Sequence, residues 1–148
     1  MEKNITVNRK ARHEYFLEEF YEAGIQLTGT EIKSIRQGRV QLKDAYIEFI
    51  GNEAFVVEMH ISAYDHGNIF NHEEKRKRRL LLHKYEIRAL KKAVSIKGYT
   101  IIPTRMYIKK GLCKLEIALA KGKALYDKRQ SLKERDQQRE IDKAMKVR

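Results

Sequence analysis

Apolar and polar residues alternate most regularly over residues 112–120, where every odd-numbered residue from Cys113 to Leu119 is apolar. A period of two is typical of a β-strand with one buried face. From residue 121 onward this apolar face ends, and the chain is almost continuously charged or polar up to residue 148. The pattern therefore predicts a packed body over residues 1–120, followed by a basic tail over residues 121–148.

Two β-hairpins are predicted from pairs of alternating segments. Residues 45–50 and 54–59 flank a short turn that contains glycine, and residues 99–108 precede 112–120 in the same way. Pro103 lies within the first strand of the second hairpin. Because proline donates no backbone hydrogen bond, we expect an edge position or a β-bulge there.

Two helices are predicted from signals at their ends. Thr28 and Glu31 have the spacing of a capping box, which indicates a helix over about residues 30–37. Apolar residues recur at helical spacing within residues 80–97, and Gly98 follows as a helix stop.

Two further stretches are less regular. Residues 15–22 stay undecided, because their apolar spacing fits a helix face while their aromatic content favours a strand. Residues 60–79 hold few apolar side chains and include five consecutive cations over 75–79, so we expect a long exposed loop. Together the segments predict a mainly β domain with an antiparallel sheet of perhaps five or six short strands and two helices. Closure of such a sheet into a small barrel would leave no open edges.

The chain is strongly basic, with 32 Lys and Arg against 20 Asp and Glu and a formal net charge of +12. Such an excess favours polyanionic partners such as nucleic acid. The single cysteine suits a reducing compartment. The sequence has neither a signal-peptide pattern nor an apolar run of about 20 residues, so we expect a soluble cytoplasmic protein that does not enter membranes.

The sequence contains no pattern typical of an active site. The five histidines lack the close spacing of metal ligands, so we expect no metal. Cys113 shares its parity with apolar neighbours and is interpreted as a buried small side chain rather than a nucleophile. Neither a glycine-rich phosphate loop nor a nucleophile elbow is found. These observations predict a binding protein without cofactors rather than an enzyme.

Cations gather at residues 9–12, 75–79 and 121–123, with tyrosines scattered nearby. This combination suits phosphate contacts plus base stacking on RNA. The tail, residues 121–148, has almost no apolar stripe that could pack on the body. We therefore expect the tail to be disordered in the free protein and helical only against a polyanion.

Four ordered motifs lie along the chain: NRKARHEY at residues 8–15, GTEIKS at 29–34, RLLLHK at 79–84, and AKGK with YDKR within 120–129. Their order and spacing resemble the SmpB family, the SsrA-binding proteins of bacterial trans-translation, over nearly the whole chain. The resemblance implies an oligonucleotide-binding (OB-type) barrel with two or three accessory helices. It also implies a strand for residues 15–22.

The resemblance implies partners and site residues as well. A member of this family binds the tRNA-like domain of transfer-messenger RNA and delivers it to stalled ribosomes, with elongation factor Tu in the delivery complex. Its tail enters the decoding centre and the mRNA channel of the small subunit. Carried over by position, the RNA-binding residues of the body are Asn8, Arg9, Lys10, Arg12, His13, Glu31, Lys33, Arg36, Lys84, Lys121 and Lys123. The tail residues at the decoding site are Tyr126, Asp127, Lys128, Arg129, Lys133, Arg135 and Arg139.

Glu31 is the one carboxylate in this set. A carboxylate that faces RNA accepts hydrogen bonds from base amino groups or 2′-hydroxyls, which gives a selectivity that lysine cannot provide. Two other functions compete with this one. A nuclease or RNA-modifying enzyme on a similar barrel needs a convergent carboxylate or metal cluster, which the sequence does not display. A general single-strand binder would show no preference for folded tRNA-like RNA over a homopolymer.

Overall fold

The computed structural model describes residues 2–64 and 71–123, which form a mainly β fold with three helices. In chain order the elements are β1 (Glu2–Val7), α1 (Arg9–Glu14), β2 (Tyr15–Ile25), α2 (Gly29–Arg36), β3 (Val40–Gln41), β4 (Tyr46–Ile50), β5 (Glu53–Val57), β6 (His60–Ile61), β7 (Arg78–Leu81), α3 (Lys84–Val94), β8 (Tyr99–Lys109) and β9 (Leu112–Gly122).

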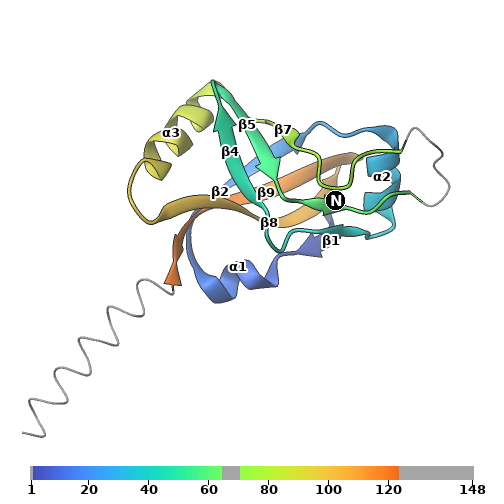
Figure 1. Ribbon diagram of the computed structural model, residues 1–148, viewed down its shortest axis with the longest axis horizontal. Coiled ribbons are helices and arrows are strands. Elements are labelled where there is room, and N and C mark those ends of the chain that lie inside the picture. Colours follow the sequence, from blue (N-terminus) through green and yellow to red (C-terminus); the bar gives the residue numbers. More distant parts are fainter. Residues whose placement is uncertain (1, 65–70, 124–148) are drawn as a thin grey trace, which may run out of the picture.

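Seven of these strands form one antiparallel sheet in the order β1-β8-β9-β2-β7-β5-β4, while β3 pairs with β6. Figure 1 shows β4 and β5 crossing over β8 and β9, with α3 at one end of the molecule, α2 at the other and α1 below the sheet. Within the described residues no ladder joins the edge strands β1 and β4. The mainly β class is therefore confirmed, whereas closure into a barrel is not.

The core is built mainly from the inward-facing residues of the sheet. Leu115 and Ile117 of β9 are fully buried, as their alternation predicts, and pack with Ile101 and Met106 of β8. Cys113 is partly buried against the same core, and burial raises the pKa of its thiol to about 11. The thiol is therefore protonated at neutral pH, as expected for a small packing residue.

Both predicted hairpins are present as β4–β5 and β8–β9. The register of β8 against β9 shifts between Pro103 and Arg105, so the proline lies at a β-bulge, as expected. The helix expected over residues 30–37 is α2. Thr28 accepts from the backbone N–H of Glu31, and the Glu31 carboxylate accepts from the N–H of Thr28.

The stretch from residue 60 to 83 differs from expectation. It was expected to be a loop up to residue 79 and a helix from residue 80, but β6 and β7 lie within it and α3 begins only at Lys84. Arg78 and Leu80 point inward and alternate with exposed neighbours, which is the period of a strand. Because one of its two inward residues is the buried Arg78, the strand lacks the alternation of apolar and polar residues by which a strand is recognised in a sequence. Residues 65–70 of the expected loop lie outside the described residues.

Residues 15–22 belong to strand β2, as the family resemblance implies. The inward residues are Leu17, Tyr21 and Ala23, whereas Phe16 and Phe20 remain exposed. These two exposed aromatics produced the misleading helical spacing. Among the described residues, none of the helices is long and apolar enough to cross a membrane.

Candidate RNA interface

Helix α1, the end of β9 and Lys123, which follows β9, bring five basic residues together below the sheet (Figure 1). We call this set the basic end; it consists of Arg9, Arg12, His13, Lys121 and Lys123. Arg9, Arg12 and His13 are exposed. The Nζ of Lys123 donates to the backbone carbonyl of Arg12 over 3.1 Å, which joins the two segments directly. Figure 1 shows the end of β9 reaching α1. The structure thus unites two of the three cation clusters seen in the sequence.

Aromatic rings lie among the cations of the basic end. The Nζ of Lys123 is 5.3 Å from the ring centroid of Phe16, and that of Lys121 is 5.6 Å from the ring centroid of Tyr99. Phe16 keeps 37% of its surface exposed. Surfaces that bind single-stranded or looped RNA combine cations for phosphates with rings for bases in this way.

Asn8 is buried between α1 and the sheet and does not face solvent. It is 5% exposed, accepts from the backbone N–H of Ala11, and donates to the carbonyls of Leu42 and Pro103 over 3.2 and 2.9 Å. The asparagine therefore caps α1 and fixes the helix to the sheet. Because its amide is already hydrogen-bonded inside the protein, Asn8 positions α1, and the direct RNA contact expected of it stays a prediction.

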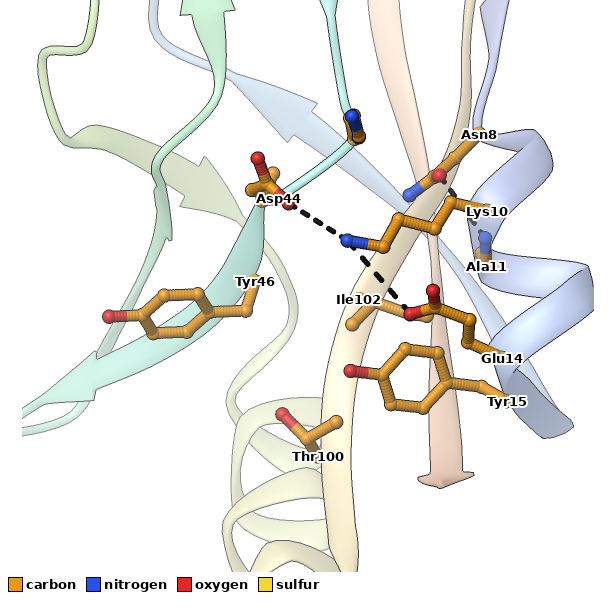
Figure 2. Close-up of a pocket in the computed structure, with 11 residues that line it drawn as sticks. Asn8, Lys10, Ala11, Glu14, Tyr15, Asp44, Tyr46, Thr100 and Ile102 are labelled. Carbon is orange, nitrogen blue, oxygen red and sulfur yellow. Dashed lines mark hydrogen bonds and ion pairs between the residues drawn. The ribbon is translucent and has the colours of Figure 1, made fainter. Parts of the chain in front are cut away.

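Lys10 lies on the wall of a cavity of about 320 Å³ that opens between α1, β4 and β8. Its Nζ is 3.1 Å from the carboxylate of Asp44 and 3.9 Å from that of Glu14 (Figure 2). Tyr15 and Tyr46 also line the cavity. The hydrogen bond and the charge of Asp44 raise the pKa of Lys10, and the hydrogen bond from Lys10 lowers the pKa of Asp44. Both side chains are therefore charged at neutral pH.

Glu31 is fully buried and bound by protein groups, contrary to the expectation that it faces RNA. Its oxygens accept from Arg76, from Arg78 and from the backbone N–H of Thr28. Burial alone would raise the pKa of Glu31, but the hydrogen bonds from Arg76, Thr28 and Arg78 outweigh it and bring the pKa to about 2. Glu31 therefore organises α2 and β7 and offers no free edge to a base.

The five cations at residues 75–79 are paired with acids of the same protein. Every one of them has a carboxylate partner: Lys75 with Glu58, Arg76 and Arg78 with Glu31, Lys77 with Glu48, and Arg79 with Glu53. Lys75, Lys77 and Arg79 are exposed, as expected for this run, whereas Arg78 is buried. What the sequence did not predict is the pairing, because the acids lie on β4, β5, α2 and the turn that follows β5, far away in sequence.

The remaining predicted cations of the body are exposed but scattered. Lys33 and Arg36 lie on α2, and Lys84 is the first residue of α3. The Nζ of Lys33 lies 5.4 Å from the ring centroid of Tyr64. Figure 1 places α2 and α3 at opposite ends of the molecule and α1 away from both, so these cations do not join the basic end.

The predicted tail residues, from Tyr126 to Arg139, lie outside the described residues. Across residues 2–64 and 71–123, no three His, Cys, Asp or Glu side chains come together in a group that could hold a metal ion. Sequence reasoning overlooked Tyr46 and Asp44 of the cavity. For Tyr46 the sequence held one indication, since this aromatic residue lies at the second position of the first strand of a predicted hairpin.

The fold and the basic end define a class: a mainly β protein with cations and aromatic rings on one surface, a combination that suits RNA. Comparisons with known proteins give the family. The family model described as "SmpB protein" matches residues 5–147. The SsrA-binding protein of Caldanaerobacter subterraneus subsp. tengcongensis is 56% identical over 97% of this chain and 91% of its own length. That of Moorella thermoacetica is 54% identical over 99% of this chain and 95% of its own.

A solved structure agrees with these matches. A chain from the structure described as "tmRNA-SmpB: a journey to the center of the bacterial ribosome" superposes with a TM-score of 0.68 and 42% sequence identity. The match covers 79% of this chain and 82% of that one. The present chain belongs to the SmpB family, which is a family of RNA-binding proteins and not of enzymes.

Proposed function

We propose that this protein is an adaptor that binds the tRNA-like domain of transfer-messenger RNA and delivers it to stalled ribosomes for trans-translation. The observation that supports this most directly is the basic end. In the part of the chain that the structure describes, neither Arg9 nor Arg12 has a carboxylate partner, whereas each cation of residues 75–79 is paired with a carboxylate. Charges left without internal partners are available to phosphates.

In this proposal the body supplies affinity and positioning. Arg9, Arg12 and Lys123 neutralise phosphates, while exposed rings near them stack on bases or sugars. Lys33, Arg36 and Lys84 make separate contacts with the RNA from other faces of the protein. The tail, including Tyr126 to Arg139, enters the decoding centre and the mRNA channel of the small subunit. Elongation factor Tu accompanies the complex during delivery.

The charge argument gives a direct test with a matched control. We expect the double variant Arg9→Gln/Arg12→Gln to bind transfer-messenger RNA more weakly and with a smaller salt dependence. A plot of log K against log salt concentration has a negative slope, and loss of two phosphate contacts makes this slope less steep by roughly one to two. The control, Lys75→Gln/Lys77→Gln, removes the same charge from residues that are already paired with Glu58 and Glu48.

Binding constants measured by filter retention at several salt concentrations distinguish the two variants. If both variants lose affinity and salt dependence equally, the basic end has no special role and binding follows net charge. A homopolymer competitor separates the proposed function from general single-strand binding. Equal competition by the homopolymer and by a tRNA-like RNA would contradict the adaptor role.

Removal of the tail tests the proposed division of labour. A chain ending at residue 126 keeps the whole basic end, so we expect its affinity for transfer-messenger RNA to change little. We expect the same truncation to abolish peptide tagging on stalled ribosomes in a reconstituted translation system. If tagging persists, the proposed action of the tail in the decoding centre is wrong, while the RNA-binding role of the body stands.

A further inference from the structure

The cavity beside Lys10 is large enough to hold a ligand and has a composition unlike the rest of the basic surface. Its volume of about 320 Å³ lies at the lower end of the range of small-ligand sites, about 300–1,000 Å³. The wall combines residues from α1, from the start of β2, from residues 43–46 and from β8. Segments that are far apart in sequence therefore converge on one opening.

Two tyrosine rings contribute to this wall. Tyr15 enters from the first residue of β2 and Tyr46 from the first residue of β4. Figure 2 shows the two rings on different sides of the opening, with Thr100 between and below them. Tyr46 keeps 42% of its surface exposed. An exposed ring on the wall of a cavity is a stacking surface for a planar group.

The charges of the cavity cancel. Lys10 and Lys43 are balanced by Glu14 and Asp44, all four of which line the opening. A phosphate gains little from such a balanced set, and the neighbouring basic end attracts it more strongly. A neutral planar group that carries both hydrogen-bond donors and acceptors fits better. An RNA base outside its stack is such a group.

We propose that this cavity binds a single unstacked RNA base, with guanine preferred. The Watson–Crick edge of guanine presents two adjacent donors, N1–H and N2–H, beside the acceptor O6. The carboxylate of Asp44 matches the two donors, and the Nζ of Lys10, 3.1 Å from Asp44, matches the acceptor. Adenine has an acceptor at N1, which a carboxylate cannot bind. Uracil has a single donor on this edge, so it can make one of the two hydrogen bonds. The proposal deepens the RNA-binding function proposed above and rests on it.

The side chains concerned are accessible. The side chain of Asp44 is 68% exposed and that of Lys10 is 37% exposed. A carboxylate has about four acceptor positions and an ammonium has three donors, so each can keep the existing ion pair and still bind a base. The base therefore adds to the pair between Lys10 and Asp44 and does not have to break it.

The test uses the full chain and four pentaribonucleotides, UUGUU, UUAUU, UUCUU and UUUUU. Their phosphates are identical, so differences in affinity report the central base alone. We expect UUGUU to bind at least about fivefold more tightly than UUAUU, the lower limit for a good bidentate contact. In NMR titrations of the labelled protein, the ring signals of Tyr15 and Tyr46 should move most.

Variants separate stacking from edge recognition. Tyr46→Leu should weaken binding of UUGUU by about five- to 150-fold, the range of base stacking on an aromatic ring. Asp44→Asn should reduce the preference for guanine over adenine and leave the affinity for UUUUU nearly unchanged. The control is Tyr85→Leu, which removes a tyrosine that is 66% exposed on α3 and lies outside the cavity. Melting temperatures of all variants verify folding.

The outcomes separate this proposal from the proposed function. Equal affinities for the four oligonucleotides, or equal losses in the Tyr46 and Tyr85 variants, would overturn the base-binding cavity. Binding of transfer-messenger RNA, measured in parallel, would then still support the adaptor role. Absence of that binding in the unaltered protein would overturn both proposals together.

Discussion

At the scale of single residues, the pair of Glu31 and Arg78 is the most consequential. Both side chains are fully buried, and Arg78 also donates to the carbonyl of Met59 over 2.7 Å and to that of Glu74 over 3.0 Å. Removal of one partner from a buried ion pair leaves the other charge without compensation, which is far more costly than loss of an exposed pair. The pair therefore makes the position of β7 depend on the start of α2.

We expect Glu31→Gln to lower the free energy of unfolding by about 3–5 kcal/mol, because Arg78 would stay buried without a counter-charge. The matched control is Glu48→Gln, whose partner Lys77 is 51% exposed. An exposed pair of this kind contributes up to about 1 kcal/mol. Urea unfolding of both variants at neutral pH gives the comparison, and similar losses would contradict the role assigned to the buried pair.

Glu31 also predicts a pH dependence. Its pKa in the folded protein is about 2, below the ordinary value of 4.5, so the unfolded chain binds the proton more readily between these values. The resulting stabilisation is fully present above about pH 4.5 and is lost as the pH falls toward 2. Stability of the unaltered protein should therefore decline more steeply across this window than that of Glu31→Gln. Parallel curves for the two proteins would exclude Glu31 as the cause.

At the scale of elements, β7 is the strand that the local sequence pattern failed to predict, because long-range packing determines its structure. Leu80 is 2% exposed whereas Leu81 is 49% exposed, an alternation that belongs to a strand. A helix was expected from residue 80 because three consecutive leucines, at residues 80–82, hide this alternation and lie just before α3. The strand was also masked by the cations of residues 75–79, whose partners lie elsewhere in the chain.

The two leucines make the assignment of β7 testable. Leu80→Ala should cost about 2–5 kcal/mol of unfolding free energy, since it removes buried methyl groups from the core. Leu81→Ala, which changes a half-exposed side chain on the same strand, should cost less than half as much. Chemical denaturation of both variants measures the difference. Equal costs would fit neither the burial described here nor a strand at this position.

The elements that the sequence predicted well have local causes. The capping box at Thr28 and Glu31 gives α2, the glycine-containing turns give both hairpins, and the proline gives the bulge in β8. The candidate site was predicted less well. Asn8 and Glu31 are polar residues within two of the family motifs, and only the folded chain reveals that both are buried. Burial of a polar group depends on distant partners, which a local pattern does not contain.

At the scale of the whole molecule, the cations behind the net charge of +12 differ in whether a carboxylate of the protein pairs with them. Carboxylates from other segments pair with every cation of the run at residues 75–79 and offset most of its charge. Within the described residues, Arg9 and Arg12 of the basic end have no carboxylate partner that would offset their charge. Electrostatic steering toward RNA should therefore follow Arg9 and Arg12 rather than the number of cations in a segment.

The hydrogen bond between Lys123 and the carbonyl of Arg12 also fixes the place from which the rest of the chain departs. Every residue from 124 to 148 is tethered there, within a radius of at most about 3.3–3.6 Å for each residue that follows. Once the body is docked, the tethered residues meet any surface within that radius at a high effective concentration, up to the millimolar range for a short tether. If the tethered segment acts on the ribosome as proposed, its contact and that of the body would combine multiplicatively into a lasting attachment.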